Sequence, residues 1–154
     1  MASNRHLGRI VALQTLYEYE FRTQAEDTSV TVREILDRNL ERYETEIQDK
    51  QFVYRLVDGV IAEQETLDGK IQPIAPEWPI TQIARVDRSI LRLGLYELLH
   101  LSGIVPPKVA INEAVELAKA FGSDNSSKFV NGVLGTALRT LVEGHEEHGD
   151  GAVQ

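Results

Sequence analysis

The sequence predicts an all-α fold of two three-helix bundles packed across one another around a buried central helix. Three observations lead to this prediction. Apolar residues recur at three- and four-residue steps, and no segment shows the sustained two-residue alternation of strands. The stretch 82–101 is apolar nearly all round, as expected of a helix inside a core. Three prolines within 72–79 divide the chain into two helical halves.

Composition and length narrow the class of protein. The chain has 154 residues, 42% of them hydrophobic and 26% charged, which suits one globular domain or two very small ones. Because cysteine is absent, disulfides, thiolate zinc sites and a cysteine nucleophile are excluded. No apolar run approaches the roughly eighteen residues of a membrane span, and the N-terminus lacks the apolar block of a signal peptide. We therefore expect a cytoplasmic protein with no membrane contact.

The first helix is expected over about 4–22, and its basic start stands out. Arg5, His6 and Arg9 lie where positive charge opposes the helix dipole, which suggests a negatively charged partner. A solvated helix end accounts for the same residues. The net charge of −8 argues against nucleic acid, but the acidic residues gather in the middle of the chain and in the tail. The apolar stripe of this helix predicts five buried residues: Ile10, Leu13, Leu16, Tyr17 and Phe21.

Two more helices complete the N-terminal half, over about 31–43 and 47–71. Their acidic residues fall mostly off the apolar stripes, so we interpret them as a solvated face and not as paired catalytic carboxylates. In the proline-rich segment 72–79, the single tryptophan, Trp78, is expected to anchor the linker against the core.

The central helix, 82–101, has a narrow polar strip of Arg85, Arg88 and Arg92, with Asp87 beside it. Gly94 costs helix stability, about 1 kcal/mol relative to alanine, and has no turn to make. We therefore expect another helix to approach closely at Gly94.

Two helices follow the central one. The first begins at Pro107 and ends at Gly122, with Phe121 on its buried face. Ser123 or Asp124 is expected to cap the last helix, in which Gly132 and Gly135 suggest tight helix crossing. The acidic segment 143–154 is expected to be disordered.

The sequence shows no recognisable catalytic or metal-binding motif. The sequence has no glycine-rich phosphate loop and no metalloprotease helix. His145 and His148 offer two imidazoles without a third protein ligand, which rarely hold a metal specifically. We therefore expect no cofactor, no metal and no catalytic residues, and interpret the chain as a binding module and not as an enzyme.

Four segments resemble a known family. VAINEAVELAKAFG, SKFVNGVLG, VDRSILRLGLYEL and ALQTLYEYEF are similar to the NusB family of transcription antitermination factors, and the similarity covers about 5–142. It implies one helical domain over 1–142, with bundles at 1–71 and 80–142 joined by the linker 72–79.

The resemblance also implies a function. Members of the family bind the boxA element of ribosomal RNA leader transcripts as single-stranded RNA, together with the small-subunit ribosomal protein NusE. With other Nus factors on RNA polymerase, that complex suppresses premature termination.

Site residues are implied where this sequence matches the family. RNA contacts would come from Arg5, His6 and Arg9, although one family arginine position falls on Leu7. Lys128 would neutralise a phosphate and Phe129 would stack on a base, with Asn125 beside them. Phe129 is also consistent with a core position, but the RNA contact is favoured because the three residues share one helix start. NusE contacts would come from Tyr17 and Asp87, and Tyr17 is also consistent with helix packing.

Two alternatives stay open. The same helical fold occurs as the N-terminal RNA-binding domain of ribosomal RNA cytosine methyltransferases, which the absence of a cofactor-binding domain and of cysteine disfavours. A helical scaffold that binds only protein would fit the thin basic segment. A homodimer that masks an RNA surface is compatible with either function.

Overall fold

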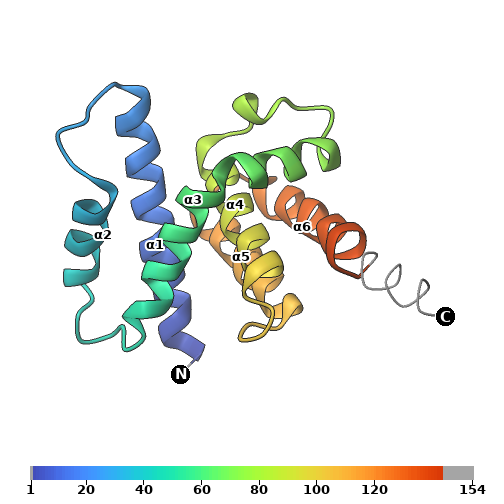
Figure 1. The fold of residues 1–154 in the computed structure, drawn as a ribbon. Helices are drawn as coiled ribbons and strands as arrows, with labels where there is room; N and C mark the ends of the chain where they lie inside the picture. Colours follow the sequence, from blue (N-terminus) through green and yellow to red (C-terminus); the bar gives the residue numbers. More distant parts are fainter. Residues whose placement is uncertain (1, 144–154) are drawn as a thin grey trace. The chain divides into compact units, whose positions relative to one another are not determined.

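The computed structural model describes residues 2–143, and the helical prediction is confirmed (Figure 1). No strand occurs in these residues. No helix of the described part is both long and apolar enough to cross a membrane. The tail expected to be disordered lies outside the described residues from position 144 on. The helices are α1 (Ala2–Gln24), α2 (Val32–Glu41), α3 (Lys50–Ile74), α4 (Arg85–His100), α5 (Pro107–Phe121) and α6 (Ser126–Ala137), with a 3-10 turn (Ile80–Gln82) before α4 and a π-helical end (Leu138–Glu143) after α6.

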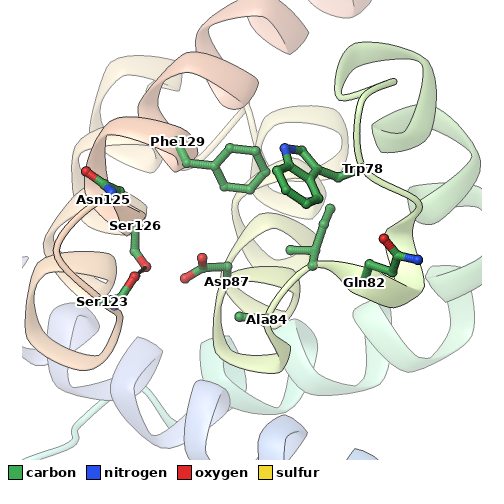
Figure 2. A pocket seen from close by; sticks show the side chains of 9 residues that line it. Trp78, Gln82, Ala84, Asp87, Ser123, Asn125, Ser126 and Phe129 are labelled. Carbon is green, nitrogen blue, oxygen red and sulfur yellow. Dashed lines mark hydrogen bonds between the residues drawn. The ribbon is translucent and has the colours of Figure 1, made fainter.

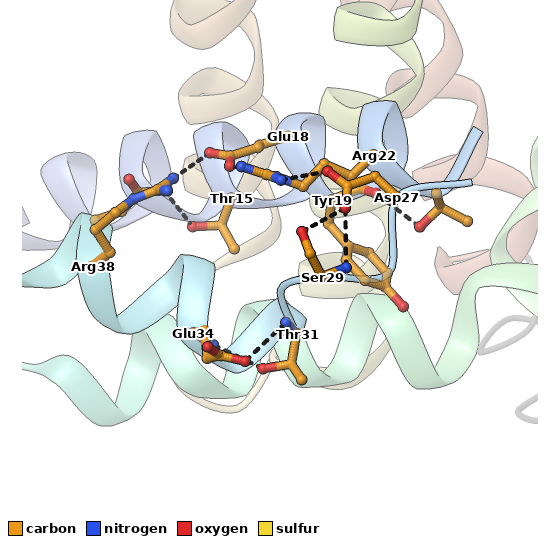
Figure 3. A network of polar contacts seen from close by, with 11 residues as sticks. Thr15, Glu18, Tyr19, Arg22, Asp27, Ser29, Thr31, Glu34 and Arg38 are labelled. Atoms are coloured by element: carbon orange, nitrogen blue, oxygen red, sulfur yellow. Dashed lines mark hydrogen bonds and ion pairs between the residues drawn. The ribbon is translucent and has the colours of Figure 1, made fainter. Parts of the chain in front are cut away.

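The chain forms two compact units, Met1–Ala62 and Glu63–Gln154, and α3 contributes to both. In the first unit α1 packs against α3 so closely that a Cβ at Gly8 would lie 2.9 Å from Val53 Cγ2. A capping box starts α2: the Glu34 N–H donates to Thr31 Oγ1 at 3.1 Å, and the Thr31 N–H donates to Glu34 Oε1 at 3.1 Å (Figure 3).

The apolar stripe of α1 is only partly buried, which corrects one prediction. Leu13 and Leu16 are buried, but Tyr17 is 40% exposed and Phe21 is 55% exposed. The buried face of α1 is centred near Ala12, which is 0% exposed. At about 100° per residue, positions 17 and 21 lie roughly 140° and 180° around the helix from Ala12, on the opposite side. The first unit therefore carries an exposed aromatic pair one helical turn apart.

A network of charged residues joins the end of α1 to the next loop and to α2 (Figure 3). Arg22 donates to Glu18 at 2.8 Å and to Asp27 at 2.6 Å, and Arg38 also pairs with Glu18. Partial burial raises the pKa of Glu18, but its hydrogen bonds with both arginines outweigh burial, so the pKa lies below its ordinary value. Hydrogen bonds from Ser29 lower the pKa of Asp27 in the same way.

These lowered pKa values predict a loss of stability in acid. The folded state holds the Glu18 proton less tightly than the unfolded chain does. The stabilisation of the fold by ionised Glu18 is therefore complete above the ordinary pKa of 4.5 and is lost as pH falls through the folded pKa. We expect Glu18→Gln to flatten the decline in the free energy of unfolding between about pH 5 and pH 3. The difference should stay below about 1 kcal/mol, since the pairs are solvent-accessible.

Urea denaturation across this pH range checks the expectation. Glu65→Gln, a change at an exposed position of α3, is the matched control and should follow the parent protein. Parallel pH curves for Glu18→Gln and the parent would show that the network contributes nothing.

In the second unit α4 is the buried central helix that the sequence predicts. All twelve residues from Asp87 to Leu98 are buried. Helices α5 and α6 pack on α4, and a Cβ at Gly94 would lie 2.6 Å from Leu134 Cδ1 and 3.3 Å from Ala114 Cβ. The expected close approach at Gly94 is therefore confirmed, and it involves both neighbouring helices.

The polar strip of α4 turns inward, and this changes the interpretation of one acidic residue. Arg88 and Arg92 are both buried. Arg92 donates from Nε to Asp68 Oδ1 at 2.7 Å and from Nη2 to Asp68 Oδ2 at 2.8 Å, a bidentate pair between α4 and α3. Asp68 therefore does not belong to a solvated acidic face, because a buried guanidinium needs a charged partner.

The proline-rich segment also differs from its prediction. Helix α3 continues through Pro73 to Ile74, and the Ala75 N–H still donates to the Ile71 carbonyl at 3.0 Å. Trp78 is 54% exposed and does not anchor the linker. Gln72 does so instead, because its amide donates to the Trp78 carbonyl at 2.8 Å and accepts from the Ile80 N–H at 2.7 Å.

Three details near the C-terminus are corrected. Gly132 has open space around its Cβ position and Gly135 faces only Arg139, so neither marks a tight helix crossing. Phe121 is exposed at the end of α5. Neither Ser123 nor Asp124 caps α6: Asn125 occupies the N-cap position and makes no side-chain cap. The hydroxyl of Ser126 instead accepts from the Ser123 N–H at 2.9 Å.

Candidate nucleic-acid interface

The basic start of α1 gathers around one aromatic ring. The guanidinium carbons of Arg5 and Arg9 lie 4.8 Å and 5.1 Å from the centroid of Phe52, the third residue of α3. Both distances are within the range of cation–π attraction. Arg5 Nη2 also lies 3.4 Å from Asp49 Oδ2. The first unit therefore holds two positive charges against one side chain.

The three predicted contacts differ in accessibility. Arg5 and His6 are partly exposed, but Arg9 is only 2% exposed. Arg5 and His6 are therefore partly open to a ligand, whereas the buried Arg9 guanidinium lies against the Phe52 ring. Spacing on a helix placed Arg5 and Arg9 on one face, but it did not distinguish the accessible residue from the buried one.

The start of α6 presents the second predicted set. Asn125 and Lys128 are exposed, and Phe129 is partly buried. Since the Asn125 side chain makes no cap, its amide remains available at the surface. Phe129 does not belong to the core: its ring points toward Trp78 (Figure 2). Lys128, Phe129 and Trp78 also line a second hollow of about 330 Å³.

A cleft of about 290 Å³ lies between the start of α6 and the start of α4. Phe129 and Trp78 lie along one side of it, and Asp87 lies between the start of α6 and Ala84 (Figure 2). The start of α6 also contributes polar side chains, from Asn125 and Ser126. This combination of aromatic faces and few polar groups is typical of a binding site.

Asp87 is the chemically unusual residue of the cleft. It is 9% exposed, and its Oδ1 is buried without a hydrogen-bond partner. A buried carboxylate oxygen that lacks a donor costs free energy, typically about 1–3 kcal/mol or more. Asp87 lies in the first turn of α4, where the helix dipole favours negative charge. The site therefore favours a ligand that brings a hydrogen-bond donor.

The predicted site residues fall into two groups. Asn125, Phe129 and Asp87 meet at the cleft of the second unit, with Lys128 at the adjoining hollow. Arg5, His6, Arg9 and Tyr17 lie on α1 in the first unit. No cluster of three metal-ligating side chains occurs within residues 2–143.

Sequence reasoning missed Trp78, Phe52 and Asp49. A tryptophan between prolines is a signal for an exposed aromatic, because such segments run along the surface. Asp49 precedes an apolar helical pattern, and aspartate is a preferred N-cap residue. These two features of the sequence could have identified Asp49 as the residue that caps the helix.

Comparison with known proteins assigns the family. Residues 6–139 match the profile described as the NusB family. The chain belongs to the NusB family. The transcription antitermination protein NusB of Chloroflexus aggregans is 44% identical over 146 residues, which cover 93% of each chain. NusB of Dehalococcoides mccartyi is 38% identical over 143 residues, covering 93% of this chain and 95% of the relative.

Solved structures of the NusB family agree with this assignment. T. maritima NusB is 32% identical with a TM-score of 0.76, covering 88% of this chain and 90% of the other. A NusB–NusE complex with double-stranded RNA contains a chain that is 26% identical with a TM-score of 0.77, covering 91% and 99%. The NusB family is one of RNA-binding antitermination factors and not of enzymes.

Proposed function

We propose that this protein binds boxA RNA of ribosomal RNA leader transcripts as a heterodimer with NusE. In that complex, with other Nus factors and RNA polymerase in the cytoplasm, it suppresses premature termination. The observation that supports this most is the similarity to the chain crystallised with NusE and RNA, which extends over 91% of this chain. The match over 93% of both sequences lends no support to a methyltransferase domain.

The start of α6 has the chemistry for single-stranded RNA. Lys128 is exposed and offers an ammonium to a phosphate. Phe129 and the exposed Trp78 offer aromatic faces beside it, and a base that stacks on such a ring contributes about 1–3 kcal/mol. Arg5 and His6 add positive charge from α1, so binding combines phosphate contacts with stacking.

Asp87 and the exposed aromatic pair of α1 suit a protein partner. The unpartnered Oδ1 of Asp87 would accept a hydrogen bond from a donor or cationic side chain of NusE. Tyr17 and Phe21 offer an apolar surface one helical turn apart, with the aromatic residue types that are enriched at interfaces. Protein and RNA therefore use different residues of this chain, although Asp87 lines the same cleft as Asn125 and Phe129.

Fluorescence anisotropy with a boxA-like single-stranded RNA tests the proposal. We expect weak binding by the protein alone and at least tenfold tighter binding with NusE, because this chain has a net charge of −8 and its N-terminal basic segment is limited to Arg5, His6 and Arg9. The logarithm of the association constant should fall with the logarithm of salt by about 0.7 for each phosphate contact. Equal affinity with and without NusE would contradict the proposal.

Two variants separate charge from stacking in the same assay. Lys128→Gln should reduce the salt slope by about 0.7, and Phe129→Ala should weaken binding with the slope unchanged. Lys119→Gln removes the same charge from an exposed position on α5 and should bind as the parent does. Sedimentation of the free protein will reveal any homodimer.

A further inference from the structure

Asp49 holds two different partners with its two carboxylate oxygens. Oδ1 accepts the Phe52 N–H at 3.1 Å and thereby caps the first turn of α3, which begins at Lys50. Oδ2 lies 3.4 Å from Arg5 Nη2. The Asp49 and Arg5 side chains are 46% and 33% exposed, so solvent and ligands reach the pair. The capping oxygen is therefore distinct from the oxygen that faces the arginine.

Phe52 links the cap to the basic cluster. Its N–H is the group that Asp49 caps, and its ring lies within about 5 Å of both the Arg5 and Arg9 guanidinium groups. Two like charges beside one ring create a positive local field, which attracts an anion. In the free protein the Asp49 carboxylate already supplies negative charge to this position.

We infer that Asp49 competes with RNA phosphate for Arg5 and lowers the affinity of the protein for RNA, while Phe52 and Arg9 position the Arg5 guanidinium. This inference rests on the proposed function, because it takes Arg5 to be an RNA contact. A phosphate that approaches Arg5 must displace Oδ2 or share the guanidinium with it. In both cases it also meets the repulsion of a nearby like charge.

Asp49→Asn tests the inference without disturbing the helix start. Asparagine keeps an oxygen for the Phe52 N–H and is as good an N-cap as aspartate, so thermal unfolding should be unchanged. In the complex with NusE, we expect boxA-like RNA to bind about two- to fivefold tighter at 50 mM salt, the range expected for release of an exposed ion pair. The gain should shrink as salt screens the charges.

Asp58→Asn is the matched control. It removes the same charge from α3, where Asp58 pairs with Arg33 at 3.0 Å and not with Arg5. An equal gain for Asp58→Asn and Asp49→Asn would overturn the inference, because the effect would then be one of net charge. An unchanged or weaker affinity for Asp49→Asn would overturn it as well.

Arg5→Gln distinguishes this inference from the proposed function. If Arg5→Gln weakens RNA binding and abolishes the gain from Asp49→Asn, the competition acts through Arg5. If Arg5→Gln weakens binding but the gain persists, the inference fails and the RNA contact stands. If the parent complex does not bind RNA, the proposed function fails. The competition between Asp49 and an anion for Arg5 can then be tested separately by NMR titration with inorganic phosphate. In that titration the Arg5 Nε–H signal must respond more strongly in Asp49→Asn than in the parent.

Discussion

Gly94→Leu should destabilise the protein by about 3 kcal/mol or more. A single Cβ at this position would already lie 2.6 Å from Leu134 and 3.3 Å from Ala114, and leucine adds three further carbons to it. All residues from Asp87 to Leu98 of α4 are buried, so a leucine at position 94 fits only if α5 or α6 shifts. Urea denaturation, with the midpoint and slope compared with those of the parent, measures the effect.

Gly69→Ala is the matched control for Gly94. Gly69 lies inside α3, does not have a positive φ, and has no atom beyond its own helix backbone and chain neighbours within 4 Å of its Cβ position. Alanine there should stabilise the protein by about 0.5–1 kcal/mol, since glycine is the poorer helix former. A small effect of Gly94→Leu, similar to that of Gly69→Ala, would show that α5 and α6 do not restrict this position.

Asp87→Ala should weaken binding of NusE at least thirtyfold, which corresponds to about 2 kcal/mol, the lower end for a truncated buried charge at an interface. In the free protein the change removes a buried oxygen that lacks a donor, and it also removes a favourable helix-dipole contact. These effects oppose one another, so the free energy of unfolding should change by less than about 1 kcal/mol. Calorimetric titration with NusE and urea denaturation measure the two quantities.

Two further variants sharpen the interpretation of Asp87. Asp124→Ala removes an exposed carboxylate from the loop before α6 and should leave NusE binding unchanged. Asp87→Asn keeps an acceptor oxygen without the charge, so its affinity should lie between those of Asp87→Ala and the parent. Normal NusE binding by Asp87→Ala would show that Asp87 does not contribute to the NusE contact.

Much of the fold could be predicted from local patterns. The three- and four-residue periodicity located six helices, and the all-round apolarity of 82–101 identified α4 as buried. Gly94 was assigned correctly because a glycine inside a buried helix, with no turn to make, leaves room for a neighbouring helix. The same reasoning predicts tight helix crossing at Gly132 and Gly135, and there it is wrong. Both lie at partly or fully exposed positions of α6, where spacing alone gives no packing information.

The candidate site was less predictable. The resemblance named Asn125, Lys128 and Phe129, and the structure shows how Trp78 joins Phe129 at the cleft, a relation that no spacing rule contains. Arg5 and Arg9 are four residues apart and look equivalent in sequence. In the structure both lie beside Phe52 of another helix, but only Arg5 is accessible.

The sequence by itself determined the helical class, the positions of the helices, the family and the absence of cysteine chemistry, because these depend on residue type and on spacing along one chain. Only the tertiary structure decided which charges are buried, which carboxylate lacks a donor and which aromatic side chains are exposed. Asp68 and Asp87 show the reason: both are acidic residues at helical positions. Arg92 pairs with Asp68, whereas no described group donates a hydrogen bond to Oδ1 of Asp87. The difference arises because burial and pairing depend on residues distant in sequence.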